Sequence, residues 1–158
     1  MINLKQGRIV CDDGFVISRK TKLDQLIKEK EANIVNTMVI NHYSHICLRN
    51  TNVNDGIYDL TLCFNHKNIE NISIIPMGRH HIPLRIIQGK YIMNDTSYLV
   101  SHCDEIEEDT RRWLNQYQSE NRKKYSWGKV GIAVDLDRSY FIHVFMKFNP
   151  PLFSRLKQ

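Results

Sequence analysis

The chain has 158 residues, the length of one domain, and 42% of them are hydrophobic, which excludes a disordered chain. A formal net charge of +5 keeps nucleic acid and acidic proteins open as partners. We expect a cytoplasmic protein, because no signal peptide is visible and no apolar run is long enough to cross a membrane. The four cysteines form no CxxC pair, so we expect reduced, mostly buried thiols.

The first third of the chain is predicted to hold a β-hairpin followed by a short helix. Asp12-Asp13-Gly14 separates two apolar runs, which is a strong signal for a hairpin over residues 7–17. Thr21, with Asp24 three residues later, predicts the N-cap of a helix over residues 22–31. The expected inward stripe of that helix is Leu23, Leu26 and Ile27.

Alternating hydrophobicity in the middle of the chain predicts an antiparallel sheet with one buried face. The expected strands are residues 44–49, 57–64 and 69–75. On the second of them, the inward residues are Tyr58, Leu60, Leu62 and Phe64. The outward residues are Asp59, Thr61 and Cys63. Residues 76–95 are a long basic excursion, with a short strand expected at residues 84–87.

The last third is predicted to add a long helix and a closing hairpin. The helix is expected over residues 101–119, with an inward stripe of Ile106, Thr110, Trp113, Leu114 and Tyr117. On the second strand of the hairpin, the core face carries Tyr140, Ile142, Val144, Met146 and Phe148. The opposite face carries Phe141, His143, Phe145 and Lys147.

These elements predict one α+β domain over residues 1–149, followed by a basic tail over residues 150–158. The domain is expected to be a twisted antiparallel sheet with one long and one short helix packed on one face.

Three surfaces are candidate partner-binding sites, and none carries a recognisable catalytic, cofactor-binding or metal-ligating set. The first is the acidic part of the long helix, formed by Asp104, Glu105, Glu108 and Asp109. The second is the outward sheet face with Phe141, His143 and Phe145. The third is the basic excursion with Arg79 and Arg85. His80 and His81 are adjacent and point apart, so we expect no metal site there. No catalytic or cofactor-binding motif is recognisable in the sequence, so we expect neither a cofactor nor an enzyme.

Several stretches, taken in order, resemble a known family. They are residues 7–18 (G-R-I-V-C-D-D-G-F-V-I-S), 21–26, 58–65 (Y-D-L-T-L-C-F-N), 113–116, 125–135 (Y-S-W-G-K-V-G-I-A-V-D) and 140–148. This order resembles small bacterial immunity proteins of polymorphic toxin loci and contact-dependent growth inhibition systems. The resemblance implies a non-enzymatic α+β protein that binds and neutralises one cognate toxin domain.

A second function stays open at this point. Phe141, His143, Phe145 and Lys147 alternate along one strand face, as aromatic and basic residues do on a nucleic-acid stacking platform. The acidic helix counts against a nucleic-acid partner, so this function is the alternative to toxin binding.

Overall fold

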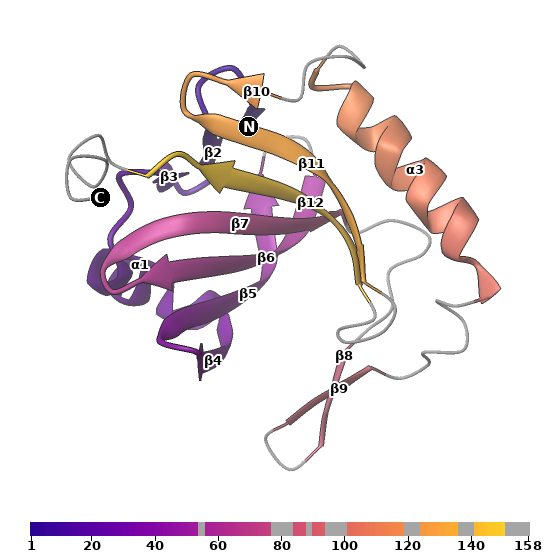
Figure 1. The fold of residues 1–158 in the computed structure, drawn as a ribbon. Coiled ribbons are helices and arrows are strands. Elements are labelled where there is room, and N and C mark those ends of the chain that lie inside the picture. Colours follow the sequence, from indigo (N-terminus) through magenta and orange to yellow (C-terminus); the bar gives the residue numbers. More distant parts are fainter. Residues whose placement is uncertain are drawn as a thin grey trace.

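A seven-stranded antiparallel sheet is the centre of the fold in this computed structural model (Figure 1). Its strand order is β10-β11-β12-β7-β6-β5-β4. The structure describes residues 1–53, 56–76, 84–87, 90–93, 101–118, 124–135 and 141–150. The strands of the sheet are β4 (Ile34–Ile40), β5 (Tyr43–Val53), β6 (Gly56–Asn65), β7 (Asn68–Pro76), β10 (Lys124–Tyr125), β11 (Gly128–Asp135) and β12 (Phe141–Phe148).

Four of these strands form a meander, and the last strand of the chain returns to extend it. β4 to β7 pair in sequence order, and β12 then pairs with β7 on one side and β11 on the other. The strands predicted at residues 57–64 and 69–75 and the closing hairpin are confirmed. β5 is longer than predicted, and β4 was missed because its residues do not alternate cleanly between apolar and polar.

The predicted N-terminal hairpin is confirmed, but it belongs to a separate sheet. β2 (Arg8–Val10) pairs with β3 (Val16–Ser18), and β1 (Ile2–Asn3), which the sequence did not predict, pairs with β2. The helix α1 (Leu23–Lys30) and a single 3₁₀ turn, η1 (Glu31–Asn33), connect this small sheet to β4.

Two predictions about α1 are wrong. Thr21 does not cap the helix, because its hydroxyl accepts a hydrogen bond from the Ser18 N–H (2.9 Å) and donates to the Val16 carbonyl (3.2 Å). The N-cap is Lys22, which makes no side-chain capping bond. Ile27 is 42% exposed, since the buried stripe of α1 runs through Leu26 to Lys30 instead.

The second helix follows its prediction closely. α3 spans Cys103–Asn115, and Ile106, Thr110 and Leu114 are its buried residues. Trp113 and Tyr117 are partly buried against the core, and the Trp113 ring lies 5.7 Å from the ring of Tyr58 on β6. The strand predicted at residues 84–87 is β8 (Leu84–Ile87), which pairs with β9 (Lys90–Met93).

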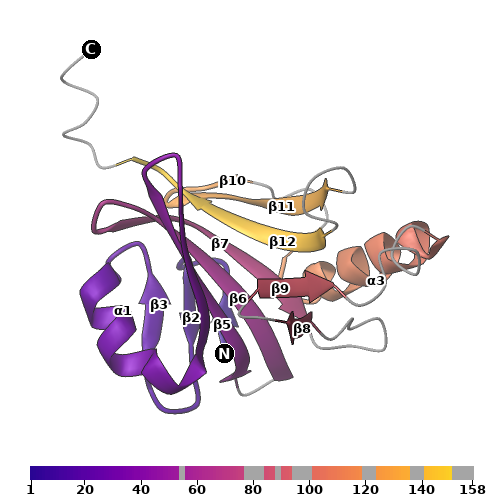
Figure 2. The ribbon, with the colours of Figure 1, turned by 90° about the horizontal axis from the view of Figure 1, so that it is seen from below.

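The hydrophobic core lies on one face of the large sheet, called here the inner face. This face carries Leu48, Leu60, Ile74 and Val144, which pair across neighbouring strands. Both helices and the three-stranded sheet contribute residues to the same core. α1 lies at one end of the molecule and α3 at the other (Figures 1 and 2). The chain is therefore a single α+β domain, with both described helices on one face as predicted. Neither helix is long and apolar enough to span a membrane.

Trp127, in the turn between β10 and β11, connects the N-terminal segment to the last strands of the large sheet. Its indole N–H donates to the Leu4 carbonyl (2.8 Å), and its ring stacks on Tyr125 and packs against Phe148. A Cβ placed on Gly7 would lie 2.4 Å from the Trp127 ring. Gly7 also has a positive φ of 63°, a conformation that L-residues adopt at a cost. The chain therefore needs glycine at position 7 for two separate reasons.

Gly14 offers a matched comparison that separates the two reasons. Its φ is 84°, but a Cβ there would meet nothing within 4 Å. We expect Gly14→Ala to lower the free energy of unfolding by about 1–2 kcal/mol through backbone conformation alone. Gly7→Ala should lower it by about 3 kcal/mol or more, because the steric conflict with Trp127 adds to that cost. Urea unfolding measures both, and equal losses would contradict the packing of Trp127 on Gly7.

Candidate functional site

The face of the large sheet opposite the core, called here the outer face, holds the candidate site. One row of directly opposed residues crosses it through Asn36, Cys47, Thr61, Ser73 and Phe145. These five side chains are partly exposed, and all but Phe145 are small or polar. Both described helices lie on the inner face, so neither covers this row.

The most highly charged part of the outer face is a row of three lysines on adjacent strands. Lys124 of β10 lies opposite Lys129 of β11, which in turn lies opposite Lys147 of β12. All three are exposed, and none forms an ion pair with a carboxylate among the described residues. Directly opposed like charges destabilise a sheet by roughly 0.2–1 kcal/mol per pair. This set, the lysine row, therefore costs stability unless an anionic group approaches it.

Phe145 adjoins the lysine row and lies across a glycine. It is opposite Gly131 on β11, and a Cβ built on that glycine would fall 2.8 Å from the phenyl ring. The ring thus occupies the space that a side chain at position 131 would fill. The Lys129 ammonium lies 5.8 Å from the ring centroid, within the range of a cation–π contact. The aromatic ring of Phe145 and the three positive charges of the lysine row therefore lie next to one another on the outer face.

The centre of the outer face is partly exposed and carries the paired charges of Asp59 and Arg49. Asp59 pairs with Arg49 (3.7 Å) and accepts a hydrogen bond from the Asn50 N–H (3.1 Å). Asp59 and Cys63 lie on the outer face as predicted, but both are buried rather than solvated. Arg49 pairs with Asp59 and His45 lies beside Cys63, whereas Thr61 between them on β6 stays partly exposed.

Burial at this centre favours the neutral forms of His45, Cys47 and Cys63. Burial lowers the pKa of His45, whose Nε2 lies 3.9 Å from the Cys63 sulfur. Burial also raises the pKa of the Cys63 thiol, and the nearby Glu70 carboxylate raises it further. Burial raises the pKa of the Cys47 thiol as well, although a hydrogen bond from Thr61 opposes the shift. Protonated thiols are poor nucleophiles and poor metal ligands.

The predicted acidic surface on α3 is present, and two arginines of the same helix compensate part of it. Asp104, Glu105 and Glu108 are exposed and Asp109 is partly buried. Arg112 lies 3.2 Å from Asp109 and 3.9 Å from Glu108, and Arg111 lies 2.6 Å from the neighbouring Glu107. Since α3 packs on the inner face, its acids and the outer sheet face point to opposite sides of the sheet.

The other predicted site residues lie on β12 or β8, or outside the described residues. His143 and Phe145 are partly buried on the outer face, as expected from the alternation of β12. Phe141 is the first residue of β12, and its side chain lies outside the described part of the structure. Arg85 lies on β8, opposite Ile92 of β9, and Arg79 lies outside the described residues, as do Tyr140 and residues 151–158 of the predicted tail.

Sequence reasoning missed the lysine row. The excess of Lys and Arg after residue 120 was visible, but it did not show which lysines become neighbours. Their common face follows from strand alternation, whereas their alignment follows from the register of two strand pairs. No group of three or more His, Cys, Asp or Glu residues suited to a metal ion occurs among the residues that the structure places.

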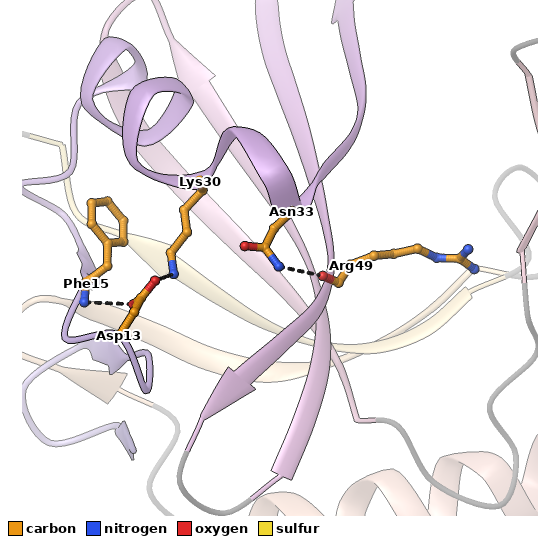
Figure 3. Close-up of polar contacts among 5 residues, drawn as sticks. All are labelled: Asp13, Phe15, Lys30, Asn33 and Arg49. Carbon is orange, nitrogen blue, oxygen red and sulfur yellow. Dashed lines mark hydrogen bonds and ion pairs between the residues drawn. The ribbon is translucent and has the colours of Figure 1, made fainter.

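A second charged cluster, at the junction of α1 and the N-terminal hairpin, is structural. Lys30 is 4% exposed, and its ammonium donates to the Asp13 carboxylate at 2.5 Å and lies 5.4 Å from the Phe15 ring centroid (Figure 3). Burial raises the pKa of the neighbouring Cys11 thiol, while the Lys30 charge partly opposes that shift. Asp13 also accepts a hydrogen bond from the Phe15 N–H (3.0 Å).

Just beyond α1, a single bond links η1 to β5. The Asn33 side-chain amide donates to the Arg49 carbonyl at 3.3 Å (Figure 3). This bond and the Lys30–Asp13 pair fix the two ends of the segment that leads into β4. The segment therefore anchors the edge of the large sheet rather than forming part of a binding site.

Comparison of the chain with protein-family models, with curated proteins and with solved structures finds no match. The function is therefore argued from the surfaces described above.

The Lys30–Asp13 pair predicts a pH-dependent stability. The hydrogen bond from Lys30 is the main cause of a lowered Asp13 pKa in the folded state. A carboxyl group of this kind stabilises the fold above its unfolded pKa of about 3.9, and the contribution is lost as the pH falls through its lower folded pKa. Asp13→Asn should therefore cost about 1 kcal/mol at neutral pH, a value discounted for solvent exposure of Asp13.

The difference from wild type should shrink when urea unfolding is repeated at successively lower pH, because the wild-type carboxyl is protonated as the pH falls through its lowered folded pKa. Asp12→Asn is the matched control, because Asp12 is exposed and precedes the same turn. This control should change the free energy of unfolding little at any pH. A loss of the same size for both variants would rule out a specific role for the Lys30 contact.

Proposed function

We propose that the protein is a non-enzymatic immunity-type protein that binds and neutralises a toxin domain in the cytoplasm. The observation that carries the proposal is the lysine row beside Phe145 on the outer face. An interface of this kind combines an aromatic anchor with charges that need an opposite partner. The resemblance of the sequence to immunity proteins supplies the partner class.

The lysine row favours an acidic toxin surface. Lys124, Lys129 and Lys147 repel one another in the free protein, so an approaching carboxylate cluster gains attraction and also relieves that repulsion. The acids of α3 attract an oppositely charged partner less strongly, because Arg111 and Arg112 already pair with three of them. The outer sheet face is therefore the preferred interface, and the acidic helix is the second choice.

A binding role fits the chemistry of the outer face better than catalysis does. Burial lowers the pKa of His45 and raises the pKa of Cys47 and Cys63, so the two thiols are protonated and the His45 imidazole is a weaker base than usual. Asp59 is engaged by Arg49 and by the Asn50 N–H. The charged groups here hold the sheet together and do not converge on a substrate.

Nucleic acid is the second candidate partner, and one observation favours it. The Phe145 ring lies against Gly131 beside Lys129, an arrangement in which a base could stack on the ring while the lysines contact phosphates. The track is short, however, because the charge ends at Lys147 and the next positions along that row are Asn71 and Cys63. We therefore rank the acidic protein partner first.

Charge reversal tests the proposed interface. The toxin to use is the C-terminal domain encoded by the open reading frame immediately upstream, expressed with and without this protein. If that domain does not inhibit growth, or does so equally in the presence of this protein, the immunity proposal fails. Otherwise Lys129→Glu/Lys147→Glu should abolish protection and slow association with the purified domain by at least about tenfold at low salt.

Two control variants locate the interface. Lys20→Glu/Lys28→Glu makes the same charge change at exposed lysines just before and on α1, which packs on the inner face, and should still protect. Glu105→Lys/Glu108→Lys on α3 should also protect. Loss of protection only in the α3 variant would move the interface to the acidic helix and imply a basic toxin.

Single-stranded oligonucleotides test the second candidate. We expect weak binding by fluorescence anisotropy that disappears at physiological salt, as for a generally basic protein. Gly131→Ala displaces the Phe145 ring without changing any charge and should leave that weak binding intact. Salt-resistant binding that Gly131→Ala reduces would favour nucleic acid as the partner instead.

A further inference from the structure

β4 is the last strand of the large sheet, and its outward end is strongly apolar. Met38, Val39 and Ile40 are consecutive and are 38%, 75% and 49% exposed. β5 pairs with β4 on one side, and no other described strand pairs with it on the other. An edge strand of this kind offers backbone hydrogen-bonding groups and apolar side chains to an incoming strand.

The geometry of the hairpin shows which backbone groups point outward. A turn of two residues, 41 and 42, both with positive φ, joins β4 to β5. In such a hairpin the flanking pair, Ile40 and Tyr43, exchanges both backbone hydrogen bonds. Alternation along the ladder then turns the N–H and C=O groups of Thr37 and Val39 toward the open edge.

Charge indicates what kind of chain fits this edge. Residues 32–48 include no Asp, Glu, Lys or Arg, although a quarter of the whole chain is charged. Proteins commonly protect an edge strand with charges, proline or a bulge, and here only the bulge between Ile34 and Asn36 is present within β4. The edge offers nothing to attract a charged partner, and two copies can meet there without contact between like charges.

We propose that β4 pairs antiparallel with β4 of a second copy of this chain, about a two-fold axis at Met38. Thr37 of one copy then lies opposite Val39 of the other, and Asn36 lies opposite Ile40. In this register, the outward N–H and C=O groups of Thr37 in one copy form hydrogen bonds with those of Val39 in the other. The two Met38 residues lie opposite each other at the axis. The interface is self-complementary, as a two-fold interface must be.

The position of the lysine row is compatible with this dimer. Four strand spacings separate β12 from β4, which is about 19 Å at about 4.8 Å each. That distance exceeds the Debye length of about 8 Å at physiological ionic strength, so the lysine rows of two copies do not repel strongly. An axis perpendicular to the sheet leaves both outer faces on the same side of a continuous sheet.

Sedimentation equilibrium of the full chain at increasing concentration tests the proposal. The wild-type mass should rise from that of one chain toward that of two. Val39→Lys should weaken dimerisation at least about tenfold by placing one charge per copy in the new pairing. Ile57→Lys is the matched control, because Ile57 is 46% exposed but lies on β6, between β5 and β7. That control should dimerise as wild type does.

Two further variants test the register. Val39→Pro removes only an N–H that points to the open edge, so it should block dimerisation while leaving the thermal unfolding temperature close to that of wild type. Met38→Cys should form a disulfide-linked dimer under mild oxidation, since opposed residues at the axis lie close enough, whereas Thr37→Cys and wild type should not.

A wild-type protein that keeps the mass of one chain at every concentration overturns the proposal. A Val39→Lys variant that dimerises like wild type overturns it too. If the Thr37 and Val39 amides become protected from hydrogen exchange only when a partner protein is added, the edge receives a foreign strand and the self-pairing proposal is wrong.

Discussion

The packing of Trp127 is the constraint on which the rest of the structure depends. Its indole N–H binds the Leu4 carbonyl, 123 residues away in the chain, and its ring fills the space above Gly7. This contact fixes the small N-terminal sheet against the end of the large one, next to Phe148 on β12. Because β12 is held there, its alternation divides the side chains of that strand between the core and the outer face. That division sets Phe145 and Lys147 on the outer face.

The two faces of the large sheet have different roles: the inner face forms the core, and the outer face forms the surface. The inner face is apolar and is covered by both described helices and the small sheet, so it provides the stability of the domain. The outer face is polar at its centre and carries the lysine row at one end and the β4 edge at the other. In a free monomer, directly opposed lysines destabilise the sheet, and an uncharged apolar edge leaves backbone groups and apolar side chains exposed. The proposals for a toxin partner and for a dimer address those two costs, and they use separate ends of the sheet.

Sequence patterns predicted the elements in which apolar residues recur at a regular spacing. β12 and the apolar stripe of α3 were placed correctly, because each follows the period of its element. β4 was missed, since three consecutive apolar residues at an exposed edge show no period of two. The Thr21 cap was wrong because the same hydroxyl has a competing bond to Ser18, and that bond depends on how β3 ends.

For the candidate site, the sequence by itself determined which face each strand residue occupies, because alternation is a local property of an extended chain. His143 and Phe145 were therefore placed together correctly, as were the acids of α3. Only the tertiary structure decided which strands are neighbours and in which register. Lys124, Lys129 and Lys147 form one row for that reason alone. The packing of α3 on the inner face likewise set its acids on the side away from that row. Pairing between distant strands is a non-local choice, made by the core as a whole and by contacts such as that between Trp127 and Leu4.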